Sequence, residues 1–257
     1  MNKVFDSLSE VESNKTKSNI RFTLLIAILL AVALTVAVLF STVFFFVRVE
    51  GQSMENTLHE GDGLIVNKCA TVERGDIVII EKVEEKLQRV FPVDGKIKLS
   101  DFEYPFVEVI SATDDIGRSY TARVLGDYLI VDAKVTLVKY KCSYNVIKRV
   151  IGLGGDVVRI KDGKVSLKMS GSSDFIPLSE EYVKDADSTY SNTTEYVVQN
   201  EQVFYLGDNR IKSEDSRDKG CCKLQDVKGV VSSFAVKTKG FTSWIYKLFS
   251  PSTDNVA

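Results

Sequence analysis

A long uncharged stretch near the start of the chain constrains its fold more than any other feature. From Phe22 to Val47 no residue is charged, and an arginine bounds the stretch on each side. A helix of this length rises roughly 39 Å, which is enough to cross a bilayer with some tilt. A cleaved signal peptide has a shorter apolar core and a small-residue cleavage site, whereas this run ends in Phe44–Arg48. The sequence therefore predicts a retained transmembrane helix over residues 22–47.

The charges beside this stretch predict its orientation. Three cations precede it, Lys15, Lys17 and Arg21. Arg48 alone follows it closely. Because positively charged flanks stay in the cytoplasm, we expect residues 1–21 to be a polar, disordered cytoplasmic tail. The rest of the chain is then extracytoplasmic, and the protein is a single-pass protein of the plasma membrane with the lipid bilayer as a partner.

Composition excludes two classes of function. The net charge is −2 and the sequence pI is about 5.7, so the chain lacks the basic excess that is typical of nucleic-acid binding. A single histidine and the absence of a CxxC pair argue against a zinc site, and no cofactor is expected. The four cysteines are Cys69, Cys142, Cys221 and Cys222. The sequence does not assign any disulfide between them.

The part of the chain after the uncharged stretch shows the pattern of a β protein. Short runs rich in β-branched residues are bounded by turn residues, as at Leu64–Val66 and Ile77–Ile80. Val157–Lys161 and Lys164–Leu167 are separated by Asp162-Gly163, which is a strong hairpin signal. The predicted fold is therefore mainly β: one N-terminal transmembrane helix followed by an extracytoplasmic β-rich domain with an inserted lobe.

The β-rich part divides into three pieces. Residues 48–80 and 145–235 are predicted to form one β domain, and residues 81–144 an inserted β-rich lobe of unknown role. Within this lobe, Glu81–Leu87 is either one or two helical turns or an exposed edge. Residues 236–257 contain aromatic residues that either rest at the membrane interface or pack against the domain.

Ser53 lies shortly after the uncharged stretch, between Gly51 and Met54. A serine in such a place is either an ordinary loop residue or, if a base removes its proton, a nucleophile. The single histidine, His59, is close in sequence, but no carboxylate is clearly placed to orient it. We interpret His59 as a surface residue, so a nucleophilic Ser53 requires a different base.

Lys148 is the candidate base, because it lies in an apolar strand pattern. It shares one face of the segment Val146–Ile151 with Val146 and Val150, and Arg149 occupies the other face with two isoleucines. Burial there would desolvate the ammonium and lower its pKa toward neutrality, as a general base requires. The alternative is an edge strand from which the ammonium reaches water. The residue pattern leaves both open.

Four segments follow one another behind the uncharged stretch: Gly51–Leu58 (GQSMENTL), Arg74–Val78 (RGDIV), Lys148–Asp156 (KRVIGLGGD) and Gly207–Arg217 (GDNRIKSEDSR). In this order they resemble the serine box, the next strand, the lysine box and the last signature motif of bacterial type I signal peptidases, which are Ser-Lys serine proteases. The resemblance covers about residues 20–80 and 145–235 and leaves residues 81–144 unmatched.

The resemblance implies roles for individual residues. Ser53 would be the nucleophile and Lys148 the general base, a Ser-Lys variant of the activated serine, with the backbone N–H of Ser53 in the oxyanion hole. Ser213 would orient the lysine by a hydrogen bond. Met54 would pack either near the site or in the core. Four charged residues would hold the framework of the site: Asp208, Arg210, Asp215 and Arg217.

The function implied by the resemblance is the removal of N-terminal signal peptides from exported preproteins, with cleavage after small residues at positions −1 and −3. The expected partners are signal-peptide-bearing preproteins, the lipid bilayer and the secretion translocon. Six residues between Val47 and Ser53 span at most about 20 Å, which would keep the nucleophile near the bilayer surface.

Two residues depart from the family pattern, and two alternatives compete with this function. Asn56 and Gly154 stand where the family usually has proline, which bears on loop rigidity. A related branch uses a histidine in place of the lysine, but Lys148 occupies that position here. A non-catalytic, membrane-anchored scaffold is the other alternative, and the intact set of Ser53, Lys148 and Ser213 argues against it.

Overall fold

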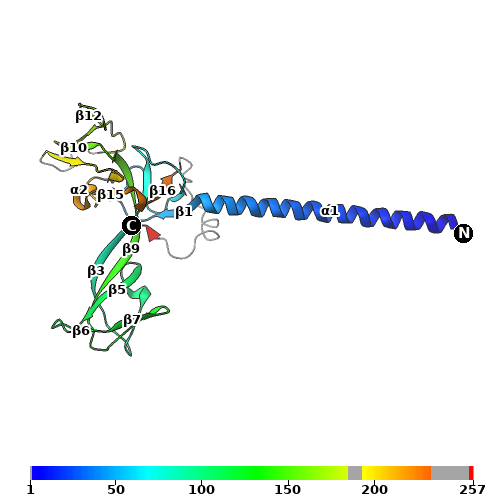
Figure 1. Ribbon diagram of the computed structural model, residues 1–257, viewed down its shortest axis with the longest axis horizontal. Coiled ribbons are helices and arrows are strands. Elements are labelled where there is room, and N and C mark those ends of the chain that lie inside the picture. Colours follow the sequence, from blue (N-terminus) through cyan, green and yellow to red (C-terminus); the bar gives the residue numbers. More distant parts are fainter. Residues whose placement is uncertain (1, 185–192, 233–254, 257) are drawn as a thin grey trace. The chain divides into compact units, whose positions relative to one another are not determined.

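The computed structural model describes residues 2–184, 193–232 and 255–256, and it divides into two compact units, Met1–Phe44 and Phe45–Ala257 (Figure 1). The first unit is the helix α1, Asn2–Val43. Its segment Phe22–Val43 is long and apolar enough to cross a membrane, and none of it is buried against protein. The segment therefore fits a membrane anchor.

The bounds of α1 differ from those predicted at both ends. The helix continues through residues 2–21, where a disordered tail was expected, and no glycine or proline interrupts that stretch. At the other end it stops at Val43 rather than at residue 47. Phe44–Val49 forms strand β1 instead, because its aromatic and β-branched residues suit a strand.

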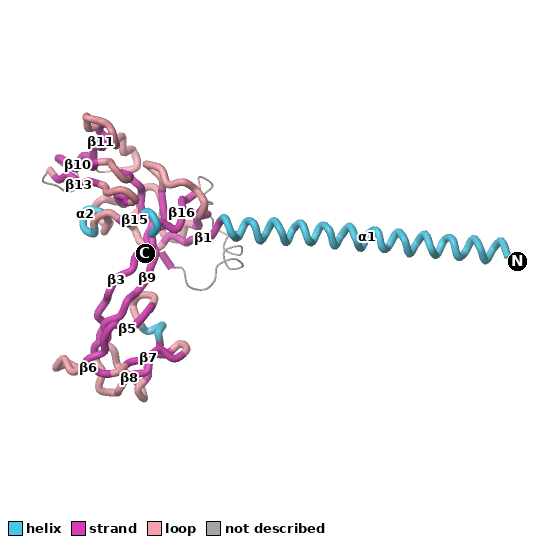
Figure 2. Tube along the Cα trace, in the orientation of Figure 1, coloured by secondary structure: helices cyan, strands magenta, loops and turns pink. Residues whose placement is uncertain are grey.

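The second unit is mainly β, which confirms the predicted fold class (Figure 2). Its strands after β1 are β2 (Gly63–Asn67), β3 (Ile77–Arg89), β4 (Lys96–Lys98), β5 (Phe106–Thr113), β6 (Ser119–Tyr120), β7 (Ala122–Leu125), β8 (Tyr128–Val131), β9 (Leu137–Leu153), β10 (Val157–Lys161), β11 (Lys164–Lys168), β12 (Ile176–Pro177), β13 (Thr194–Val197), β14 (Gln202–Leu206), β15 (Cys222–Lys223), β16 (Val227–Val231) and β17 (Asn255–Val256). The short helix α2 is Ser216–Lys219, and two 3₁₀ turns are Leu99–Asp101 and Leu224–Asp226.

The largest sheet has ten strands and is organised around β9. Its path runs β15-β14-β9-β17-β1-β2-β16-β3, and β3 also pairs with β9, so the path returns on itself. Such closure leaves few free edges. Two smaller sheets have the orders β12-β11-β10-β13 and β4-β8-β7. β9 pairs with β3 over residues 137–149 and with β5, β17 and β14 at residues 137–142, 145 and 149–153, so most of its length is paired on both edges.

The predicted inserted lobe grows out of β3 and β9. These strands pair antiparallel from Ile77 opposite Arg149 to Arg89 opposite Leu137, so the boundaries predicted after residues 80 and 144 fall inside continuous strands. Glu81–Leu87, for which helical turns were one alternative, is part of β3. Figure 1 shows β3 and β9 running together toward β5, β6 and β7. The lobe has its own apolar cluster, which includes Phe102, Leu129 and Tyr140.

Other local expectations can be compared with the structure directly. The hairpin predicted at Asp162-Gly163 joins β10 to β11, and both turn residues have positive φ, 49° and 74°, which confirms it. The four cysteines are free thiols. Most of the predicted C-terminal segment, residues 236–254 and 257, lies outside the described residues.

Candidate active site

The loop that carries Ser53 is fixed by its own turns and by the end of β14. The amides of Thr57 and Leu58 donate to the carbonyl of Met54, at 3.1 and 2.9 Å, and the carbonyl of Ser53 accepts from the amide of Asn209 at 3.0 Å. A Cβ on Gly207 would lie 2.5 Å from that carbonyl, so only glycine allows this close approach. The loop is therefore held against the segment that follows β14.

The side chain of Met54 holds the Ser53 loop by packing into the hydrophobic core. Its side chain is 2% exposed and belongs to the apolar cluster that contains Leu58, Leu64 and Ile147. Of the two places expected for Met54, the structure shows the core. Because Met54 is the residue after Ser53, its packing limits how far the serine can move.

Lys148 lies in the middle of β9, opposite Val78 of β3, and is 3% exposed. It is thus buried in the sheet and does not reach solvent from an edge. Burial lowers the pKa of its ammonium to about 8, while the nearby carboxylate of Asp215 opposes this shift and the positive charge of Lys82 adds to it. With this pKa, about a tenth of Lys148 is neutral at pH 7 and about half at pH 8, whereas almost none would be neutral with the ordinary value of 10.5.

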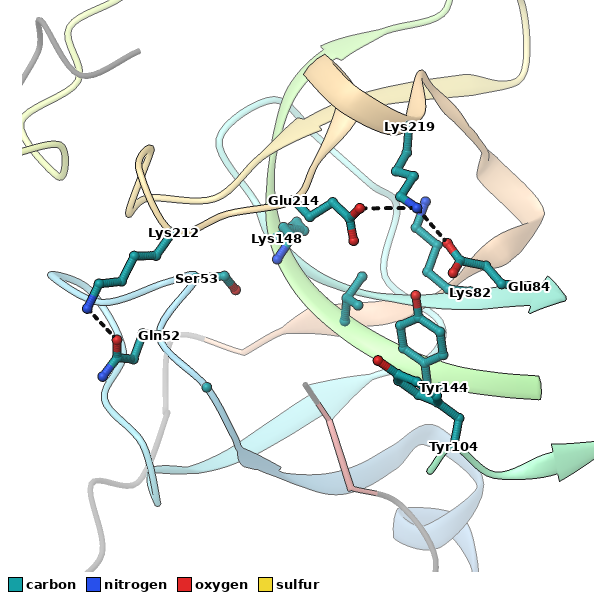
Figure 3. Close-up of a pocket in the computed structure, with 12 residues that line it drawn as sticks. Gln52, Ser53, Lys82, Glu84, Tyr104, Tyr144, Lys148, Lys212, Glu214 and Lys219 are labelled. Atoms are coloured by element: carbon teal, nitrogen blue, oxygen red, sulfur yellow. Dashed lines mark hydrogen bonds and ion pairs between the residues drawn. The ribbon is translucent and has the colours of Figure 1, made fainter. Parts of the chain in front are cut away.

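Ser53 and Lys148 line the same cavity, which has a volume of about 270 Å³ (Figure 3). Figure 3 shows the two side chains directed into this space, from the loop and from β9. Most of its other lining residues carry polar or charged side chains, among them Glu214. The two residues singled out as nucleophile and base are thus brought together although they come from distant parts of the chain.

Ser213 does not make the hydrogen bond to Lys148 that the resemblance implies. Its hydroxyl is buried and has no hydrogen-bond partner among the residues that the structure describes. The reason is local packing: a Cβ on Gly207 would lie 2.2 Å from the Ser213 Oγ, so the hydroxyl rests against the glycine backbone. A buried hydroxyl without a partner remains available to accept a new one.

Asp208 is held in a buried ion pair that the sequence did not reveal. Arg149 donates to both its oxygens, at 2.8 and 2.7 Å, and the hydroxyl of Thr57 also donates to it. Arg149 additionally donates to the carbonyl of Gly75 at 2.7 Å and stacks on the ring of Tyr182. This network joins the Ser53 loop to β9. The signal for it was the charge of Arg149 on a strand face that it shares with Ile147 and Ile151.

Asp215 caps the short helix α2 and also fixes the chain after β14. It accepts from the amide of Gly207 at 3.0 Å and from the guanidinium of Arg217 at 2.8 and 2.9 Å. Arg217 in turn donates to the carbonyls of Arg210 and Ser213, at 2.7 and 3.2 Å. The pair therefore ties together the segment that closes one side of the cavity.

The side chain of Arg210 is fully buried and forms an ion pair with Glu180. Its Nε also donates to the carbonyl of Gly207 at 3.1 Å. Glu180 lies in a loop without periodicity, so the sequence offered no signal for this partner. Asp215 and Arg217 thus hold together the segment after β14, Arg210 bonds to the carbonyl of Gly207 in it, and Asp208 links it to the Ser53 loop through Thr57.

The lobe contributes to the cavity wall, which sequence reasoning missed. Lys82 and Glu84 of β3, Tyr144 of β9 and Tyr104 all line it. The rings of Tyr104 and Tyr144 lie 5.2 Å apart. His59, in contrast, is exposed and lies 3.9 Å from the carboxylate of Asp62. It is a surface residue, as expected.

Asn56 has a backbone φ of 98°, which proline cannot adopt because its ring fixes φ near −65°. We expect Asn56→Pro to lower the free energy of unfolding by about 1–3 kcal/mol and to slow catalysis by displacing Ser53. Glycine tolerates positive φ, so Asn56→Gly should change the free energy of unfolding by less than about 1 kcal/mol and the cleavage rate by less than about twofold. Urea unfolding and a cleavage assay on the two variants provide the measurement. A fully stable Asn56→Pro protein would contradict the loop conformation described above.

The chain is similar to known proteins over most of its length. The family described as "Signal peptidase, peptidase S26" matches residues 20–236. Signal peptidase I of Streptococcus pneumoniae (serotype 4) is 27% identical over 202 residues, covering 74% of this chain and 81% of that protein. Signal peptidase I V of Bacillus subtilis is 25% identical over 208 residues, covering 75% and 86%. A crystal structure of a signal peptidase I from Enterococcus faecalis shares 30% identity over 34% of this chain and 83% of that one, with a TM-score of 0.29.

The protein is therefore a serine peptidase, a hydrolase whose apolar N-terminal helix fits a membrane anchor. More specifically, it belongs to the signal peptidase family, peptidase S26. The resemblance seen in the four motifs is confirmed.

Proposed function

We propose that this protein removes N-terminal signal peptides from exported preproteins by a Ser-Lys dyad, with Ser53 as nucleophile and Lys148 as general base. The family and the names of the relatives support the substrate class. The observation that carries the dyad is the buried Lys148, whose pKa is lowered to about 8, in the cavity that Ser53 also lines. A non-catalytic scaffold would have no need for a desolvated lysine beside a serine.

In the proposed reaction, neutral Lys148 takes the proton of the Ser53 hydroxyl as its oxygen attacks the scissile carbonyl. The resulting ammonium gives the proton to the leaving amine, and an acyl-enzyme remains. Water, activated by Lys148 in the same way, then releases the signal peptide and regenerates the serine. Ser213, whose buried hydroxyl has no partner among the described residues, is suited to accept from the transient ammonium.

The backbone N–H of Ser53 is the proposed donor to the oxyanion. Among the described residues it makes no hydrogen bond, whereas the carbonyl of the same residue is fixed by Asn209. A donor that is free in the resting loop and rigidly positioned is what oxyanion stabilisation requires. The residue two positions before the serine is Gly51, which offers no hydroxyl of its own.

The proposed substrate is a membrane-tethered preprotein, cut outside the cytoplasm after small residues at −1 and −3. The positive charges before the anchor support a cytoplasmic N-terminus. The lipid bilayer and the secretion translocon are the further partners that this location would bring. Residues 48–80 and 145–235 supply the dyad, while residues 81–144 supply part of the cavity wall.

The test uses the purified full-length chain in detergent with a secretory precursor. Two matched precursors carry alanine at −1 and −3, or a bulky charged residue at −1. We expect cleavage of the first after the −1 alanine, shown by sequencing the new N-terminus, and a rate at least about 100-fold lower for the second. An uncut alanine precursor, or a cut away from this site, would overturn the proposed function.

A further inference from the structure

A second lysine faces the cavity from the strand beside Lys148. In the pairing of β3 with β9, Val78 lies opposite Lys148 and Lys82 lies opposite Tyr144. Because alternate residues of a strand share a face, Lys82 projects from the same face as Lys148. Both side chains line the cavity (Figure 3).

The ammonium of Lys82 is fixed by Tyr205. It donates a hydrogen bond to the Tyr205 hydroxyl and lies 4.5 Å from the centre of that ring, a cation–π distance. Tyr205 is fully buried in β14, and its own amide donates to the hydroxyl of Ser216 at 2.9 Å. The positive charge is thus held in place by a rigid neutral partner.

Lys82 differs from Lys219 in having no carboxylate partner among the described residues, and from Lys212 in being held by the buried Tyr205. Lys219 pairs with Glu84 and Glu214, at 3.3 and 3.1 Å, and Lys212 donates to the side chain of Gln52 at 2.6 Å. Within the described part of the chain, no Asp or Glu lies within ion-pair distance of Lys82. Its charge is therefore not neutralised where it stands.

The other charges that face Lys148 come from the segment before and within α2. Asp215 and Glu214 favour its ammonium form, and Arg217 disfavours it. Asp215 is already bonded twice to Arg217, and the Glu214 side chain is 63% exposed. Asp215 has the larger effect of these charges on the pKa of Lys148, and Lys82 opposes it without a carboxylate partner of its own among the described residues.

We propose that Lys82 is a positioning residue that, held by Tyr205, keeps a second positive charge at the cavity and thereby maintains Lys148 in its neutral, proton-accepting form. This inference rests on the proposed Ser-Lys function. It agrees with the direction in which Lys82 changes the pKa of Lys148. It also gives a role to β3 beyond supporting the lobe.

The test compares pH profiles of kcat/KM for the full-length chain with the alanine precursor. Lys82→Met removes the charge and keeps most of the side-chain volume, so we expect the acidic limb to move up by roughly 0.5 to 1 pH unit. At pH values below the limb, kcat/KM of Lys82→Met should be about three- to tenfold lower than that of wild type, and at high pH the two should be equal. Lys82→Glu should shift the limb further, and Lys82→Arg should leave it near the wild-type position.

Lys86→Met is the matched control, because Lys86 lies on the same strand but pairs with Glu84 at 3.1 Å and packs over Tyr104. It should not move the limb. Tyr205→Phe, which removes the hydroxyl that holds Lys82, should give a smaller shift in the same direction.

The possible outcomes separate this inference from the proposed function. If wild type shows no cleavage, the Ser-Lys function itself fails. If wild type cleaves but Lys82→Met keeps the same limb, Lys82 does not act on Lys148. A change confined to KM would assign Lys82 to substrate binding and would also overturn the inference. Should Lys82→Met fail to fold, Lys82→Arg and Tyr205→Phe are compared instead. The inference holds if Tyr205→Phe moves the acidic limb to higher pH while Lys82→Arg does not, and it fails if both keep the wild-type limb.

Discussion

Replacing Ser53 or Lys148 with alanine is expected to abolish preprotein cleavage, with kcat/KM falling roughly 10⁴- to 10⁶-fold. The nucleophile cannot attack without its oxygen, and the hydroxyl stays protonated without the base. Because the two act as a unit, the double variant should be about as inactive as either single one. Measured cleavage of a secretory precursor provides the readout, with membrane insertion and folding verified for each variant.

Burial of Lys148 should also lower the free energy of unfolding. Measuring this effect tests, independently of catalysis, whether Lys148 is desolvated as a general base requires. The folded pKa of Lys148 is about 8 and the ordinary value is 10.5, so at pH 7 the unfolded state holds the proton more tightly. At about 1.4 kcal/mol per unit, the penalty is about 3 kcal/mol, present in full below pH 8. It declines as pH rises from 8 toward 10.5, because the folded lysine is then already neutral. Lys148→Met should therefore be more stable than wild type at pH 7 and nearly equal to it near pH 10.5.

Urea unfolding of the full-length chain at several pH values measures this difference. Lys141→Met is a matched control on the same strand, since Lys141 is 43% exposed at the side chain and pairs with Glu108 at 3.4 Å. That variant should change the free energy of unfolding by less than about 1 kcal/mol at either pH. Equal stability of Lys148→Met and wild type across this range would mean that Lys148 is not desolvated, and the choice of base would have to be revisited.

Strand alternation predicted the position of Lys148 but not its degree of burial. The pattern around Val146 and Val150 places the lysine on an apolar face, yet an edge strand and a central strand have the same local sequence. What distinguishes them is pairing with β3 and β14, whose residues lie far away in the chain. The family resemblance supplied the pairing of Ser53 with Lys148 that the pattern alone could not.

The partners of the charged residues were less predictable. Arg149 and Asp208 are 59 residues apart, and Arg210 and Glu180 are 30 apart, with no shared periodicity. The lobe was equally hard to read. From Lys82 to Arg89, β3 alternates between half-buried and exposed residues, but Val83 and Leu87 lie on the exposed face and charged or polar residues on the half-buried face, so hydrophobicity does not reveal the pattern. Its contribution to the cavity wall follows only from the full pairing of β3 with β9.

Removing Asp208 is expected to have the largest effect on stability. Asp208→Ala would leave the guanidinium of Arg149, whose side chain is 12% exposed, without its carboxylate. Breaking a buried ion pair on one side typically lowers the free energy of unfolding by about 3–5 kcal/mol, because the remaining charge is buried and uncompensated. The Thr57 hydroxyl would lose its acceptor as well. Urea unfolding at pH 7 measures the change.

A surface pair provides the contrast. Arg89 and Asp115 lie 2.9 Å apart with side chains 56% and 59% exposed, so Asp115→Ala should change the free energy of unfolding by less than about 1 kcal/mol. Replacing both buried partners, as in Arg149→Met with Asp208→Leu, should recover much of the stability lost by Asp208→Ala, since no unpaired charge remains. Catalysis should not recover with it, because the hydrogen bond from the Thr57 hydroxyl to Asp208 also holds the Ser53 loop. If the double variant regained both stability and cleavage, the ion pair would have no part in positioning the nucleophile.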